Sequence, residues 1–213
     1  MKNKLPLPRK KVAMRWAAVL CVLVILCGLT DAYGFTRSSV LRRQERFYFV
    51  QEAQLIECLP DAYEKRIGKG EILAAKNDHV LFLGMARWTP WKGWQPGFAW
   101  PVERVGNLVD SMYAYYSWDS EGNVYPYVVF GVVNDPRVDA VKVSFEDWQT
   151  KDVRMLDVQL FTDGSGQRYF LCAAEMTDIC RVGITAWGGE VLLQDTSLEE
   201  SGISLSYDWD RDM

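Results

Sequence analysis

The stretch SMYAYYSWDSEGNVYPYVVFGVVN, residues 111–134, places two runs rich in aromatic and β-branched residues on either side of a polar segment. Tyr, Phe and Val favour strands, whereas Ser, Gly and Asn favour turns. The stretch predicts a β-hairpin whose turn is residues 120–123. We expect rings to pack across its two strands, namely those of Tyr113, Tyr115, Tyr116, Trp118, Tyr125 and Tyr127.

Strand-like runs continue on both sides of this hairpin. Residues 70–76 and 79–86 flank Asn77-Asp78, which predicts a second hairpin with a tight turn. Residues 138–145 and 155–161 alternate between apolar and polar, as strands with one buried face do. The side chains expected to face inward in these two runs are Val141, Val143, Phe145, Leu156, Val158 and Leu160.

Further runs at 168–175, 180–187 and 190–193 follow the turn residues Asp163-Gly164-Ser165-Gly166 and Gly188-Gly189. Roughly eight or nine short strands separated by turns are typical of a mainly β protein. We predict an antiparallel β-sandwich over about residues 70–194. The acidic tail, 195–213, is weakly patterned and is expected to be loose at its end.

The N-terminus carries an apolar run, WAAVLCVLVILCGL, residues 16–29, after a basic segment. Extended to Tyr33, the run would span about 26 Å as a helix, with aromatic residues at both ends. This predicts a single-pass membrane anchor. A signal peptide cleaved after Ala32, or lipidation at Cys27, are the alternatives. In each case the basic flank stays in the cytoplasm and the rest of the chain is exported.

The residues after the anchor predict a helix over 38–57, capped by Ser38 or Ser39. Its apolar positions are Leu41, Phe47, Val50 and Ala53. The chain would then comprise a basic cytoplasmic tail, an anchor or signal segment, a helical stalk or first packed element, and the extracytoplasmic β domain. The corresponding residues are 1–15, 16–35, 36–69 and 70–213.

The charge balance argues against nucleic-acid binding. Beyond residue 35 there are 18 Lys and Arg against 27 Asp and Glu, a net charge of −9, and nucleic acid needs a basic surface. A cluster of arginines next to the anchor could contact lipid phosphates or simply form a solvated helix face. Its members are Arg37, Arg42, Arg43 and Arg46.

The residue types that catalysis requires are scarce. His79 is the one histidine, it lies beside a predicted turn, and no nucleophile motif accompanies it. No phosphate-binding loop and no cysteine–histidine cluster is present, so neither a cofactor nor a metal is expected. The acidic segments 119–123 and 208–212 lack the full spacing of a calcium loop.

Two of the five cysteines can be related to each other by strand register. If a turn centres on Met176, Cys172 lies opposite Cys180. Opposed Cα atoms in neighbouring strands are about 4.5–5.5 Å apart, which overlaps the distance that a disulfide needs. The register therefore predicts either a Cys172–Cys180 disulfide or two buried thiols in contact.

The stretch RWTPWKGWQPGFAWP, residues 87–101, holds Trp88, Trp91, Trp94 and Trp100. Its prolines and glycines exclude a helix and a central strand, which predicts a long loop between two hairpins. In polyproline conformation the first three indoles would form one stripe. Exposed, such a stripe could bind sugar, membrane or protein. We expect most of the indoles to face the core instead, with Trp91 or Trp94 exposed.

The stretch PYVVFGVVNDPRVDAVKV, residues 126–143, resembles a pattern in uncharacterised single-pass surface proteins of Gram-positive bacteria, mainly through GVVNDP at 131–136. Residues 69–86 resemble the first hairpin of these proteins. The resemblance spans about residues 38–194. It implies an anchored, extracytoplasmic, β-rich domain, and it brings no catalytic residue and no ligand.

Three functions follow from these observations. The first is a non-catalytic binding or accessory module of the cell envelope, contacting an envelope protein or cell-wall glycan through the tryptophan stretch or a sheet edge. The second is a cell-wall hydrolase built on carboxylates, which would need clustered acids and a raised carboxyl pKa. The third is a purely structural envelope domain.

Overall fold

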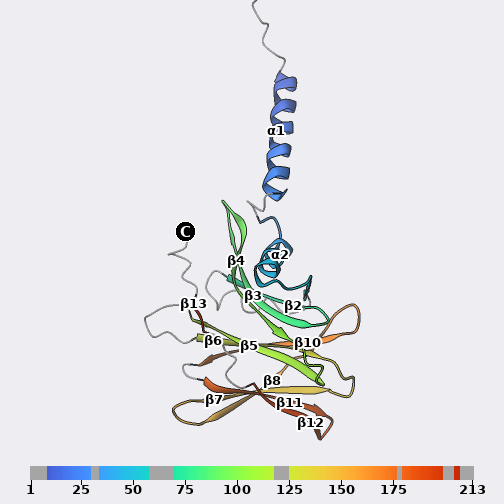
Figure 1. Ribbon diagram of the computed structural model, residues 1–213, viewed down its shortest axis with the longest axis vertical. Coiled ribbons are helices and arrows are strands. Elements are labelled where there is room, and N and C mark those ends of the chain that lie inside the picture. Colours follow the sequence, from blue (N-terminus) through green and yellow to red (C-terminus); the bar gives the residue numbers. More distant parts are fainter. Residues whose placement is uncertain are drawn as a thin grey trace, which may run out of the picture.

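The computed structural model describes residues 9–29, 34–57, 70–117, 125–176, 179–198 and 204–206. Two helices, α1 (Arg9–Leu29) and α2 (Arg37–Tyr48), precede the strands (Figure 1). The strands are β1 (Gln54–Leu55), β2 (Gly70–Lys76), β3 (Val80–Thr89), β4 (Gly93–Glu103), β5 (Val109–Ser117), β6 (Tyr125–Val133), β7 (Ala140–Asp147), β8 (Val153–Val158), β9 (Phe161–Thr162), β10 (Arg168–Met176), β11 (Ile179–Gly188), β12 (Val191–Leu198) and β13 (Ser204–Ser206).

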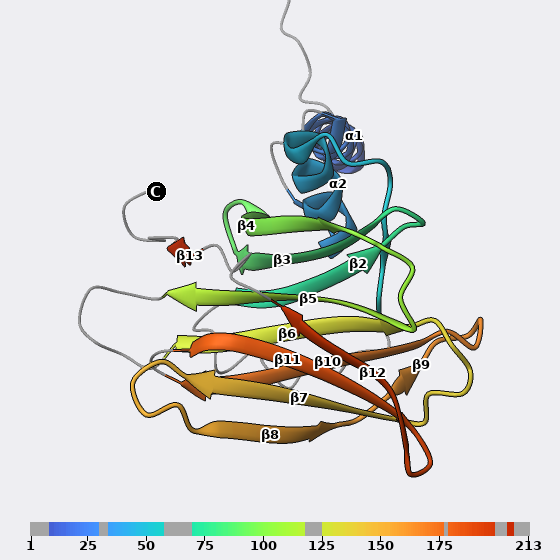
Figure 2. The ribbon, with the colours of Figure 1, turned by 60° about the horizontal axis from the view of Figure 1, so that its bottom comes forward.

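The strands form three sheets, stacked as layers (Figure 2). Sheet A has the order β1-β2-β3-β4, sheet B the order β13-β5-β6-β10-β9, and sheet C the order β12-β11-β7-β8. Neighbouring strands are antiparallel except for β13, which runs parallel to β5. The prediction of a mainly β, antiparallel fold is confirmed. The described residues build three sheets, however, where a sandwich has two.

Sheet B is the middle layer because its strands are apolar on both faces. In β6 every residue from Tyr127 to Val133 is buried. Val128 and Phe130 pack with Leu83 of sheet A, whereas Val129 packs with Phe145 of sheet C. Burial on both faces explains why β6 is continuously apolar while β7 alternates.

Helix α2 covers the outer face of sheet A, where Val40 and Leu41 are buried. The side chain of Thr36 caps the helix by accepting the Ser39 N–H, so the predicted cap was wrong. The predicted end was also wrong, because Phe49 takes a left-handed conformation with φ of 56°. Phe47, an expected core residue, is 75% exposed.

The chain after α2 joins sheet A at once. The Glu45 carboxylate, itself buried, accepts the Ala53 N–H at 2.5 Å and bends the chain towards β1. Strand β1 then pairs with β2, with Gln54 opposite Lys76. Residues 37–57 are thus the first packed element of the domain and not a separate stalk.

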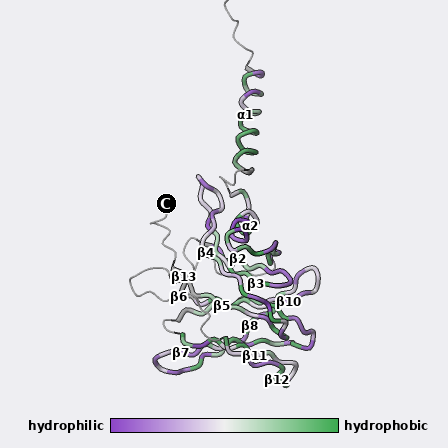
Figure 3. Tube along the Cα trace, in the orientation of Figure 1, coloured by the Kyte–Doolittle hydropathy of each residue, from purple (hydrophilic) through white to green (hydrophobic). Residues whose placement is uncertain are grey.

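Helix α1 projects away from the sheets (Figure 1). Every side chain from Lys10 to Leu26 is exposed. Figure 3 shows hydrophilic and hydrophobic residues mixed in its first turns and mainly hydrophobic ones in the later turns. Within the described residues, no helix is both long and apolar enough to cross a membrane.

A buried polar network fastens sheet A to sheet B. Asp110, 3% exposed, accepts hydrogen bonds from Arg104 at 3.2 Å and from the Asn134 amide at 2.9 Å. Arg104 also donates to the Asn77 carbonyl in the β2–β3 turn at 2.9 Å. Asn134 belongs to the GVVNDP segment. Because its hydrogen bonds in this network join loops of the fold, its role in them is structural.

The cysteine register was wrong. Strands β10 and β11 lie in different sheets, and Cys172 pairs in register with Val129 instead of Cys180. Both cysteines are free thiols. Cys172 is buried in the core, which raises its pKa to about 11. Cys180 is half-buried and its thiol donates to the Glu146 carbonyl at 3.4 Å.

Other sequence predictions have mixed outcomes. The β2–β3 hairpin is confirmed, and His79 is exposed in its turn. The β5–β6 hairpin is confirmed with Tyr115 opposite Tyr127. Within the acidic tail, β12 extends to Leu198 and β13 pairs with β5, whereas the last residues, 207–213, lie outside the described residues. Cys58 and the acidic segments 119–123 and 208–212 lie outside the described residues.

Candidate functional site

The tryptophan stretch is a β-hairpin and not a long loop. Strand β3 continues to Thr89, β4 begins at Gly93, and Trp88 lies directly opposite Trp94. The single stripe of Trp88, Trp91 and Trp94 that polyproline geometry would give is therefore not formed. The prolines of the stretch are compatible with a strand because β4 is at the edge of sheet A, where an N–H is not needed on the outer side.

The four indoles divide into two pairs. Trp91 at the turn is 90% exposed and Trp88 is 52% exposed. Trp94 is half-buried beneath α2, with the Arg37 guanidinium 5.4 Å from its ring centre. Trp100 is half-buried and meets the Tyr48 ring edge-on at 6.3 Å. Two of the four indoles are therefore half-buried and two are exposed, where most were expected to face the core. Trp91 or Trp94 was expected to be exposed, and Trp91 is the exposed one.

The hairpin turn is held against the chain that follows α1. Gly34 donates to the Lys92 carbonyl at 3.0 Å and accepts the Trp94 N–H at 2.7 Å. The Arg43 guanidinium donates to the Trp94 carbonyl at 2.9 Å. A Cβ on Gly34 would overlap that same carbonyl, so glycine permits the close approach.

Phe35 follows this contact and is 47% exposed. We refer to Phe35, Trp88 and Trp91 as the aromatic tip. Figure 1 shows the β3–β4 turn on the α1 side of the sheets. The hairpin carries Arg87 and the exposed Lys92, and Glu71, one register position from Arg87 on the paired strand β2, forms an ion pair with Arg37 at 2.6 Å. The aromatic tip is therefore an exposed apolar surface on a hydrogen-bonded hairpin, with Lys92 in its turn.

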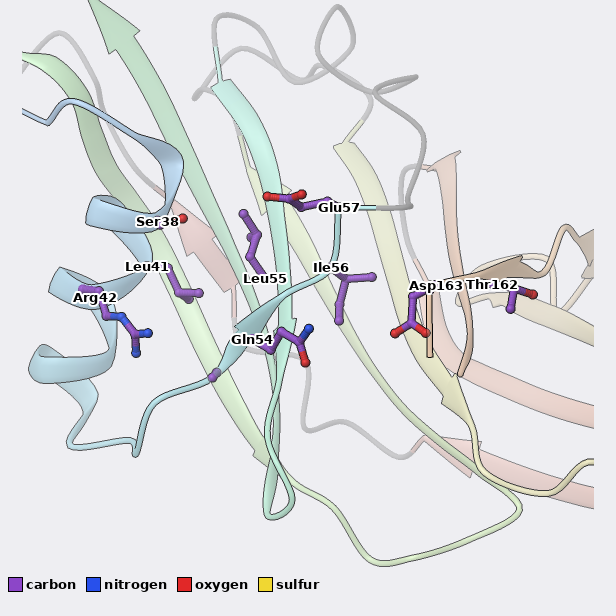
Figure 4. Close-up of a pocket in the computed structure, with 11 residues that line it drawn as sticks. Ser38, Leu41, Arg42, Gln54, Leu55, Ile56, Glu57, Thr162 and Asp163 are labelled. Carbon is purple, nitrogen blue, oxygen red and sulfur yellow. The ribbon is translucent and has the colours of Figure 1, made fainter. Parts of the chain in front are cut away.

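A second candidate is a hollow of about 680 Å³ between α2, β1 and the β9–β10 turn (Figure 4). Arg42, Glu57 and Asp163 supply charges to its wall. Arg42 is engaged with Glu45 and Glu52, each at 3.1 Å. Asp163 accepts hydrogen bonds from the Ser165 and Tyr169 hydroxyls, which hold its pKa at about 2.

Asp163 does not have the pKa that a carboxylate general acid requires. A general acid needs a raised pKa, whereas hydrogen bonding lowers the pKa of Asp163. Asp135 and Asp147 also have lowered pKa values because each accepts hydrogen bonds; Asp135 directly precedes a turn and Asp147 ends β7 just before one. In the part of the chain that is described, no group of three His, Cys, Asp or Glu residues is placed to hold a metal.

We compared the chain with known proteins. No protein-family model matches it, and no curated protein and no solved structure is significantly similar. The resemblance to single-pass surface proteins of Gram-positive bacteria remains a prediction. The geometry of this chain is therefore the basis for proposing its function.

Proposed function

We propose that the chain is a single-pass membrane protein whose β domain lies outside the cytoplasm and serves there as a non-catalytic binding or accessory module of the cell envelope. The apolar run 16–29, within α1, would form the core of the membrane segment. The basic residues before it would stay in the cytoplasm. The aromatic tip would be the contact surface nearest to the membrane.

The exposure of α1 is the observation that carries this proposal. Its apolar side chains are exposed around the whole helix, and five consecutive residues from Val22 to Leu26 are about half-exposed or more. A helix that is apolar on all sides suits lipid better than water. Leaving one large apolar side chain in water costs roughly 1.5–3 kcal/mol relative to burying it.

The binding role is supported by the aromatic tip. Tyr and Trp are enriched at contact surfaces because they bring a large apolar area together with a polar group. Trp91 is held at a hairpin turn with little contact of its own, which suits contact with something other than this domain. The pKa values of Asp135, Asp147 and Asp163 are lowered, which does not favour the hydrolase, so we do not carry that alternative further.

Cell fractionation of the full chain, carrying a C-terminal tag, tests the anchor. We expect the protein to remain in the membrane pellet after alkaline carbonate extraction, with an uncleaved N-terminus by mass spectrometry. External protease should digest the β domain in intact spheroplasts. Leu23→Arg should move the protein towards the soluble fraction, because arginine at a helix centre costs about 2.5–3.5 kcal/mol on insertion.

Leu23→Ile is the matched control, since it keeps the apolar character of α1 and should stay in the pellet. A full-length chain that is soluble without any substitution would overturn the anchor. A mature chain beginning near residue 33 would instead identify the segment as a cleaved signal.

A further inference from the structure

We propose that the aromatic tip binds the surface of the same bilayer that α1 enters, so that the domain is attached to the membrane at two points. The inference rests on the proposed function, because it takes α1 as inserted. It names the partner of the aromatic tip as lipid headgroups, preferentially anionic ones, and not a second protein.

The position of the aromatic tip is the first argument. Gly34 is hydrogen-bonded to Lys92 and Trp94 at the start of β4, and it lies five positions after Leu29 at the end of α1. A chain of this length spans at most about 18 Å. When α1 is inserted, its end lies in the interfacial region, so the turn is close to the headgroups whatever the path of the connecting residues.

The chemistry of the aromatic tip is the second argument. Two indoles and a phenyl ring are exposed there by 90%, 52% and 47%. Tryptophan concentrates at membrane interfaces, where its apolar ring and its N–H group are both accommodated. Phe35 follows Gly34, which is hydrogen-bonded to the hairpin, and its ring is exposed.

Charge is the third argument. Lys92 is exposed in the turn, and Glu71, the acidic residue beside Arg87 on strand β2, forms an ion pair with Arg37 at 2.6 Å. The chain beyond residue 35 as a whole has a net charge of −9. A basic patch near the membrane is attracted to anionic lipid by about 1 kcal/mol per residue, whereas the acidic remainder is repelled.

Rigidity is the fourth argument. The turn is fixed by the opposed Trp88 and Trp94, by the two Gly34 hydrogen bonds and by Arg43, which links it to α2. An indole held in place loses little conformational entropy when it enters the interface. Two attachment points would also fix the tilt of the domain relative to the membrane. In this orientation sheet C would be the layer farthest from the membrane, because it lies on the side of the domain opposite α1 (Figure 1).

Quenching of tryptophan fluorescence by brominated lipid tests the proposal directly. The full chain is reconstituted into vesicles of phosphatidylcholine and phosphatidylglycerol, with bromine near the headgroup end of the acyl chains. Trp88→Phe/Trp91→Phe should remove a large part of the lipid-quenched fluorescence. Lys92→Glu should reduce the quenching of the tip in these vesicles and have less effect in phosphatidylcholine alone.

Two controls separate the possible failures. Trp148→Phe removes an indole that is 60% exposed in the β7–β8 turn of sheet C, and the lipid-quenched signal should not change. Trp16→Phe reports on α1. If Trp16→Phe lowers the quenched signal but Trp88→Phe/Trp91→Phe does not, the aromatic tip does not bind lipid and the anchor stands. If Trp16→Phe has no effect either, the proposed function fails.

Soluble acrylamide provides the reciprocal measurement. In vesicles the indoles of the aromatic tip should be protected from acrylamide, compared with the same chain in detergent, while Trp148 remains accessible. The purified system contains no second protein, so equal acrylamide quenching of the tip in vesicles and in detergent would overturn the proposal and leave a protein partner as the alternative.

Discussion

Asp110 illustrates how one buried carboxylate can hold two sheets together. Its two oxygens accept hydrogen bonds from Arg104, Asn134 and the Asn107 N–H, all between 2.9 and 3.2 Å. The partners come from the loops after β4 and β6. Removing the carboxylate would leave the Arg104 guanidinium, which is 15% exposed, without its counter-charge.

We predict that Asp110→Ala lowers the free energy of unfolding by about 3–5 kcal/mol, the typical cost of breaking a buried ion pair from one side. Urea denaturation measures it. Asp157→Ala is the matched control, because Asp157 is 85% exposed and pairs with Lys142 at the surface. Its loss should cost only about 0–1 kcal/mol. Equal costs for the two substitutions would contradict the network.

Asp163 predicts an acid dependence of stability. Its pKa in the folded chain is about 2, which is below the value of about 3.9 for an unfolded aspartate. Folding therefore favours the ionised form. This stabilisation is complete above about pH 4 and is lost as the pH falls towards 2.

Thermal denaturation between neutral pH and pH 2 measures this effect. We expect Asp163→Asn to lose stability mainly at neutral pH and to show a shallower decline in melting temperature below pH 4. Ser165→Ala, which removes one hydrogen bond to the carboxylate at 2.6 Å, should give an intermediate profile. Parallel curves for the parent chain and Asp163→Asn would rule out the proposed cause.

At this scale the sequence predicts turns well. Asn77 and Asp163 were assigned to turns, and each accepts backbone N–H groups two or more residues ahead. It could not predict the exposure of the tryptophans. Trp88 and Trp94 are neighbours in one hairpin, but only Trp94 is covered by α2, a segment about fifty residues earlier.

Helix α2 shows the limit at the scale of elements. The expected apolar stripe assumed a helix running to residue 57, yet the helix ends at Tyr48 and buries Val40, Leu41, Gln44 and Glu45. Gln44 donates to the carbonyls of Met85 and Gly97 at 3.0 and 3.1 Å, where a bulge interrupts the β3–β4 register. Gln44 can be buried because the carbonyl groups of sheet A accept its hydrogen bonds at this bulge. The spacing of apolar residues along the helix cannot reveal such acceptors.

We predict that Leu41→Ala lowers the free energy of unfolding by about 2–5 kcal/mol, since Leu41 packs with Ala75, Phe82 and Ala99. Phe47→Ala should change it by no more than about 0.5 kcal/mol because Phe47 is exposed. Denaturation of both variants separates the two accounts of α2. A larger loss for Phe47→Ala than for Leu41→Ala would instead support the buried face that the sequence predicted, which included Phe47.

The whole molecule depends on sheet B, which both other sheets cover. Strand β6 lies between β5 and β10 and is buried on both faces. We predict that its amides exchange with deuterium more slowly than those of the edge strand β8, and at the rate of global unfolding. Exchange followed by peptide mass spectrometry measures this. Slower exchange in β8 than in β6 would contradict the central role of sheet B.

The sequence by itself determined the strand-rich class, most of the hairpins and turns, and the alternating faces of β7 and β8. These are local properties, set by side-chain periodicity and by residues suited to turns. Only the tertiary structure decided that the described strands form three sheets, that β10 and β11 separate so that Cys172 and Cys180 do not pair, and that Trp88 and Trp91 stay exposed. Those outcomes depend on which distant surface covers each face, and burial between segments far apart in the chain leaves no fixed spacing in the sequence.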